Sequence, residues 1–239
     1  MSGVIVTAAE LAHAAYTRGL SEELRTDVSR RVLDVLGNSL AAADQEPARI
    51  AEAVAAEWGG TTGATAFGSG ARYPAASAAL VNGTLAHALD FDDTHLPSVL
   101  HPSAPVLPAA LATAQAHGRS GAQLLDAAGL GIELAVRLGM AGYDKELGNS
   151  IFFERGLHAT AICGAVGAAV ASALLQGLDA AGVAHAAGIA SSMGSGIIEA
   201  NRTGGTIKRV HCGWAAHAGV SAADLARHGL TGPPTVVEG

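Results

Sequence analysis

Lysine, cysteine, aromatic residues and charge are all scarce in this chain of 239 residues, and the shortages exclude several classes of protein. Only 15% of the residues are charged while 49% are hydrophobic, which excludes an intrinsically disordered chain. Two cysteines in a chain of this length cannot hold a disulfide scaffold. A formal net charge of −7 argues against general nucleic-acid binding. The chain is long enough to bury one large core or two modest ones.

One segment is long enough to cross a membrane. Gly156–Leu178 contains no formally charged residue, but about half of it is alanine and glycine, and it lacks flanking aromatic residues or a Lys/Arg asymmetry. Small residues equally suit a helix buried among other helices, so we predict a core helix and no membrane association. The first residues lack a basic region followed by an apolar run, so we expect no signal peptide and a cytoplasmic protein.

Helix-forming residues dominate the rest of the chain, and proline is rare. Ser21 and Asp179 are candidate N-caps, and Ser120 with Gln123 forms a capping box. We predict a nearly all-α fold with helices over residues 4–19, 21–44, 47–58, 74–89, 104–117, 120–138, 158–177, 179–192 and 211–228. Loops or irregular segments are expected over residues 60–72, 90–103, 139–156 and 193–210.

Polar residues gather at three places where apolar helices begin or end. Each of them could cap a helix, fill the core or lie in solvent, yet three clusters at helix ends can converge on one cleft. The clusters are His87, Asp90, Asp92, Asp93, Thr94, His95 and His101; then His158; then Lys208, Arg209 and His211.

Metal binding is one chemistry that these clusters suggest. Asp92-Asp93 resembles an aspartate-rich Mg²⁺–diphosphate motif, but the sequence has no second carboxylate cluster to complete it. Zinc would suit the spacing of His87, Asp90 and His95, although no HExxH motif is present. We therefore predict no metal.

Two further chemistries remain. Nucleophilic catalysis has little support, because there is no GxSxG motif and no motif surrounds either cysteine. Acid–base chemistry on a small carboxylate would use Lys208, Arg202 or Arg209 to hold carboxylates and a histidine or aspartate to move a proton. Composition alone does not choose among these possibilities.

Taken in order, several segments resemble the MmgE/PrpD family, which includes 2-methylcitrate dehydratase, cis-aconitate decarboxylase and iminodisuccinate epimerase. The run LDFDDTH followed by HPSAPVLPA is the most specific part of the match. The matching segments are Asn82–His95, His101–Ala112, Ser120–Leu138, Gly156–Asp179 and Gly205–Gly239.

The resemblance implies a fold made of a large all-α domain with a smaller α/β lid domain inserted late in the chain. Residues 1–239 would form the N-terminal helical domain, incomplete relative to full-length members and without the lid. The resemblance also implies a homodimer built through the helical domain. A second chain that supplies the lid is a further possible partner.

Carried over from the family, the active-site positions are Asp90, Thr94, His101, His158 and Lys208. We predict that Asp90, His101 and His158 are catalytic, with His101 or His158 carrying the proton and Asp90 orienting a histidine. Thr94 and Lys208 would bind the substrate. Further site residues of the family, a lysine, a histidine and a tyrosine, would come from beyond residue 239.

The function implied is that of a lyase without a metal or organic cofactor. It would act on a small di- or tricarboxylate, as a 2-methylcitrate dehydratase does, by dehydration or decarboxylation next to a carboxylate. One alternative is an epimerase that uses the same proton abstraction. Another is a catalytically incomplete half that needs a partner chain. The sequence does not name the carboxylate.

Overall fold

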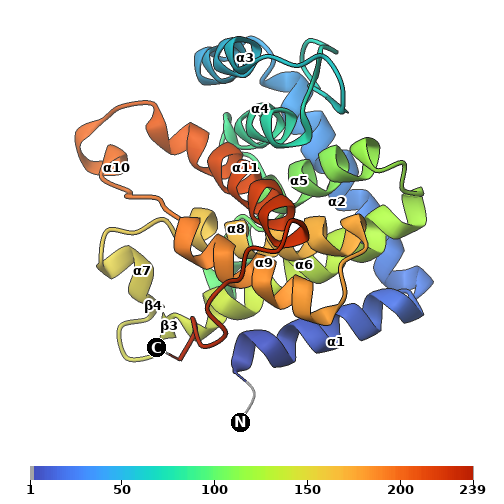
Figure 1. Ribbon diagram of the computed structural model, residues 1–239. Coiled ribbons are helices and arrows are strands. Elements are labelled where there is room, and N and C mark those ends of the chain that lie inside the picture. The colour runs from blue at the N-terminus through green and yellow to red at the C-terminus, as the bar shows by residue number, and fades with distance from the viewer. Residues whose placement is uncertain (1–2, 239) are drawn as a thin grey trace.

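The computed structural model describes residues 3–238, which fold almost entirely into α-helices (Figure 1). Two antiparallel hairpins of two-residue strands interrupt them: β1 (Ala64–Thr65) with β2 (Arg72–Tyr73), and β3 (Tyr143–Asp144) with β4 (Asn149–Ser150). The prediction of an all-α fold is confirmed. The helices are α1 (Val4–Arg18), α2 (Glu22–Ala41), α3 (Glu46–Trp58), α4 (Ala75–His87), α5 (Ser103–Ala116), α6 (Gly121–Ala141), α7 (Ile151–Glu154), α8 (Ala159–Gln176), α9 (Ala180–Met193), α10 (Ala200–Thr203) and α11 (Ile207–Arg227).

The predicted caps begin the helices as expected. The Ser21 side chain accepts a hydrogen bond from the backbone N–H of Leu24, and the Asp179 side chain accepts one from Gly182. Ser120 and Gln123 form the reciprocal capping box at the start of α6. Each cap satisfies a backbone donor that has no partner within its helix, so the local sequence fixes where these helices start.

Helix α8 lies at the centre of the molecule, between α5, α6, α9 and α11 (Figure 1). Its length and composition would allow it to cross a membrane, but 89% of its 18-residue window is buried inside the fold. The prediction of a buried core helix is therefore confirmed. Alanine and glycine make up half of α8, so neighbouring backbones approach it closely.

Glycines set two of the closest helix crossings. A Cβ on Gly83 of α4 would lie 2.8 Å from the Cα of Gly213 in α11. A Cβ on Gly131 of α6 would lie 2.5 Å from the carbonyl oxygen of Gly167 in α8. No side chain fits at such distances, so these helices pack backbone against backbone.

Two predicted helix boundaries were wrong, and one predicted loop contains short elements. Helix α11 begins at Ile207 and not at His211, which places Lys208 and Arg209 in its first turn. Helix α6 continues to Ala141, and the predicted loop after it contains the β3–β4 hairpin and α7. Local propensity did not reveal the start of α11 because glycine-rich sequence precedes it. It did not reveal the short elements after α6 because that sequence is rich in aromatic residues.

Candidate active site

The segment between α4 and α5 provides most of the polar side chains of the candidate site. Helix α4 ends at His87, whose side chain is fully buried. Asp90 has a positive φ of 58°, a left-handed conformation that aspartate adopts more readily than most residues. At this turn the two carboxylates have different partners. Asp90 contacts Lys208 of α11, whereas Asp92 contacts His87 and His101.

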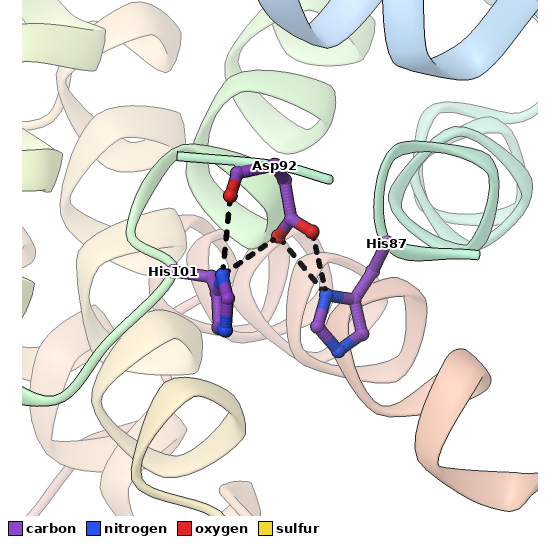
Figure 2. Close-up of side chains that lie close together, drawn as sticks. All are labelled: His87, Asp92 and His101. Atoms are coloured by element: carbon purple, nitrogen blue, oxygen red, sulfur yellow. Dashed lines mark hydrogen bonds and ion pairs between the residues drawn. The ribbon is translucent and has the colours of Figure 1, made fainter. Parts of the chain in front are cut away.

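Figure 2 shows the buried carboxylate of Asp92 between two imidazole rings. His87 Nδ1 lies 2.9 Å and 3.1 Å from the two carboxylate oxygens, and His101 Nδ1 lies 3.5 Å from Oδ2. His101 Nδ1 also lies 3.3 Å from the backbone oxygen of Asp92 and 3.4 Å from Thr94 Oγ1. In both rings Nε2 points away from Asp92.

Asp90 forms the second charged group of the site. Lys208 Nζ lies 2.8 Å from each of its carboxylate oxygens, and Arg209 Nη1 lies 3.0 Å from Oδ2. Partial burial alone would raise the pKa of Asp90. The Lys208 hydrogen bonds and the neighbouring charges of His87, Lys208 and Arg209 outweigh it and lower the pKa to about 2. Asp90 is therefore ionised at neutral pH.

His158 and His211 form a buried pair, with 3.0 Å between their Nδ1 atoms. His158 is the N-cap residue of α8, as its predicted place at the start of that helix required. Burial, and then the neighbouring His87, His211, Lys208 and His101, lowers the pKa of His158 to about 2. Burial, with His87 and Lys208, also lowers the pKa of His211. Both rings are therefore neutral at neutral pH.

The ion pair of Asp90 with Lys208 and the rings of His101 and His158 meet at one pocket of about 380 Å³. A larger pocket of about 620 Å³ lies beside it and includes His211, but its walls are mostly apolar. The smaller pocket holds four of the ionisable residues predicted from the sequence, so we take it as the candidate site. Its lining residues are Asp90, His101, Phe153, His158, Ile198, Asn201 and Lys208.

Four of the five residues predicted from the sequence therefore line one pocket, although they come from different parts of the chain. The fifth, Thr94, contacts His101 but is not part of the lining. Lys208 is held by Asp90, so Asp90 pairs with a lysine in addition to lying 3.7 Å from His87 Nε2. The rings of His87 and His101 are oriented mainly by Asp92.

Sequence reasoning did not assign Asp92, His87 or His211 to the site. Asp92 was considered only within a metal motif, and His87 and His211 stood among many polar residues. Their spacing did contain a signal, because His87 and Asp92 flank Asp90 closely, but only the fold shows which side chains converge.

Other residues weighed from the sequence lie elsewhere. His95 Nδ1 is 2.8 Å from Ser98 Oγ, so the spacing considered for zinc does not assemble. Asp93 accepts hydrogen bonds from the backbone and hydroxyl of Ser103 and so caps α5. Arg202 pairs with Glu199 at the surface.

The group best arranged to hold a cation, within the described part of the chain, is His87, Asp92 and His101, whose ligand atoms lie within 4.8 Å of one another. In the structure His87 Nδ1 is at hydrogen-bond distance from the Asp92 carboxylate, and His101 Nδ1 is at hydrogen-bond distance from the Asp92 backbone oxygen. The cysteines offer no nucleophile, because burial raises the pKa of Cys163 to about 12 and that of Cys212 well above its ordinary value.

Comparison with known proteins places this chain in a family. The family model described as the MmgE/PrpD N-terminal domain matches residues 6–239. Human cis-aconitate decarboxylase is 33% identical over 231 residues, which cover 95% of this chain and 46% of the human protein. The mouse enzyme is 30% identical, covering 100% and 48%, and the Aspergillus terreus enzyme is 34% identical, covering 72% and 35%. The chain thus spans less than half the length of these relatives.

Proposed function

The chain belongs to the MmgE/PrpD family, and we propose that its pocket serves a cofactor-independent lyase acting on a small di- or tricarboxylate. One observation carries the proposal: a single pocket is lined by the ion pair of Lys208 with Asp90, by His101, whose Nδ1 faces Asp92, and by the neutral ring of His158. The relatives are named cis-aconitate decarboxylases, which makes decarboxylation of such a tricarboxylate the first reaction to test. Dehydration of 2-methylcitrate is the second.

Lys208 and Arg209 would hold a substrate carboxylate. An ammonium group has three N–H donors, and the two oxygens of Asp90 accept from only two of them. Arg209 Nη1 is buried and, apart from its 3.0 Å contact with Asp90 Oδ2, has no partner within residues 3–238. Each cation therefore keeps a donor for an incoming carboxylate, and the pairing with Asp90 holds both in place before substrate arrives.

His101 is the residue we assign as the proton carrier. Its Nδ1 is bound by Asp92, its side chain is 22% exposed, and it lines the pocket. The pKa of about 2 makes His158 a poor proton carrier near neutral pH, so we assign it a hydrogen-bonding role as a neutral ring. This choice resolves, as a proposal, the alternative that the sequence left open between His101 and His158.

The decarboxylation step balances without an added reactant. The C–C bond to one carboxylate breaks, CO₂ leaves, and its bonding electron pair stays on the adjacent carbon. The imidazolium of His101 then donates its Nε2 proton to that carbon. Fixed donors near the remaining carboxylates stabilise the negative charge as it develops. Dehydration would use the same groups to remove a proton and release water, and epimerisation would return the proton to the opposite face.

The test uses the complete protein, treated with a chelator, on cis-aconitate, 2-methylcitrate, citrate and iminodisuccinate, with products followed by NMR. We expect CO₂ release from cis-aconitate, and a loss of roughly 10²–10⁴-fold in kcat for His101→Gln. Water loss or inversion of a stereocentre would instead indicate the dehydratase or epimerase. Turnover of none of the four would refute the proposal.

Assembly is a separate part of the proposal. We propose a homodimer built through the helical domain, and a lid supplied either by further sequence or by a second chain. Activity assays therefore need the complete native assembly, since an open pocket leaves the reacting groups in contact with water.

A further inference from the structure

We propose that Asp92 is a positioning residue that sets the protonation pattern of the pocket. It holds His87 and His101 as Nδ1–H tautomers, which leaves the Nε2 lone pair of His101 free to take up a proton. This inference rests on the proposed function for its catalytic consequence, but the tautomers themselves are independent of which substrate is bound.

The hydrogen-bond partners of His101 Nδ1 determine its tautomer. The carboxylate of Asp92 and the backbone oxygen of the same residue can only accept hydrogen bonds, whereas the third neighbour, Thr94 Oγ1 at 3.4 Å, can donate or accept. A bare nitrogen facing two such oxygens would be repelled by both. His101 Nδ1 must therefore carry the hydrogen, and the proton it exchanges with a substrate must pass through Nε2.

Burial of the contact with Asp92 indicates that His87 also carries its hydrogen on Nδ1. The side chains of His87 and Asp92 are both fully buried, and His87 Nδ1 contacts both carboxylate oxygens. A buried carboxylate needs donors, and these two imidazoles are the side-chain donors that the described residues provide. His87 thereby fixes the plane of the carboxylate, while His101 occupies its open side.

The substitution that tests this is Asp92→Asn. An amide of the same shape is neutral, and its NH₂ group replaces one of the two carboxylate oxygens; where that group takes the Oδ2 position, it faces both ring nitrogens as a donor. We expect His101 to reverse to the Nε2–H tautomer. The kcat should then fall about 10²–10⁴-fold, with KM changed less than about 3-fold. ¹⁵N NMR of labelled histidines in the complete protein reads the tautomers directly.

Asp126→Asn is the matched control. Asp126 has the same exposed fraction as Asp92, 4%, and it is held by Arg25 in a pocket with none of the active-site residues. Its loss should lower the melting temperature but leave the histidine tautomers and kcat nearly unchanged. A purely structural role for Asp92 would make the two variants behave alike, which would overturn the inference.

Four further outcomes are decisive. If His101 keeps Nδ1–H in Asp92→Asn, the inference fails. If Asp92→Asn does not fold, Asp92→Glu keeps a carboxylate, and it must preserve both Nδ1–H tautomers. A stoichiometric divalent metal that is lost from Asp92→Asn would also overturn the inference. If no substrate is turned over but the tautomers change as expected, the positioning role stands and the proposed function falls.

Discussion

The neutral histidine pair should make the stability of the protein fall steeply in mild acid. His158 is 1% exposed, and burial among His87, His211 and Lys208 lowers its pKa from 6.5 to about 2. The unfolded chain takes up a proton on this ring near pH 6.5, whereas the folded protein does not. The stabilisation is therefore fully present above pH 6.5 and is lost as the pH falls below it.

The magnitude follows from the width of that pH window. Each pH unit below about 6.5 costs about 1.4 kcal/mol in the free energy of unfolding for one such histidine. His158 alone should therefore cost about 2 kcal/mol between pH 8 and pH 5. His211, whose pKa is also lowered, acts in the same direction. A typical domain has only about 5–15 kcal/mol of stability, so the loss is large.

Urea denaturation at pH 8, 7, 6 and 5 measures this effect. His158→Gln removes the titrating ring but keeps a polar group near His211, so its stability should depend on pH with a slope smaller by about one proton. Leu174→Ala, at a buried position of the same helix, should lower stability by about 2–5 kcal/mol equally at every pH. A wild-type stability that is flat from pH 8 to pH 5, or an unchanged slope in His158→Gln, would refute the reasoning.

Three other outcomes are expected. Lys208→Ala should lower kcat/KM about 10²-fold, or roughly 3 kcal/mol, with Lys208→Arg recovering part of it and the exposed Lys145→Ala nearly silent; equal effects of the two alanine variants would remove Lys208 from the site. Cys163 and Cys212 are buried and should react with a thiol reagent only as fast as the protein unfolds; rapid labelling of the native protein would contradict their burial. Sedimentation at tens of micromolar should show a dimer, and a well-behaved monomer would count against the assembly proposal.

The sequence predicted the helices well because their ends carry local signals. Side-chain caps such as Ser120 with Gln123 and a C-terminal glycine such as Gly177 act within a few residues, so they are visible without the fold. The start of α11 was missed because two glycines precede it and its first turn carries Lys208 and Arg209 without a side-chain cap. Nothing local distinguishes that turn from a basic loop.

The site could be predicted only in part for a related reason. The family resemblance gave Asp90, His158 and Lys208, and the fold brings them to one pocket. It did not show that Asp92, two residues from Asp90, binds the histidines. Which carboxylate goes where depends on the left-handed turn at Asp90 and on the approach of α11, and both are properties of the folded chain.

Because of the glycine contact between α4 and α11, the spacing of the reactive groups and the shape of the pocket wall depend on different parts of the molecule. Gly83 lies one turn before His87 in α4, and Gly213 lies one turn after Arg209 in α11. The main-chain crossing therefore sets the distance between the imidazole of His87 and the cations of the first turn of α11. Side chains of the wall, such as Phe153, do not take part in that crossing. Substitutions of such lining residues could therefore admit a different carboxylate while the spacing of the reactive groups stays as it is.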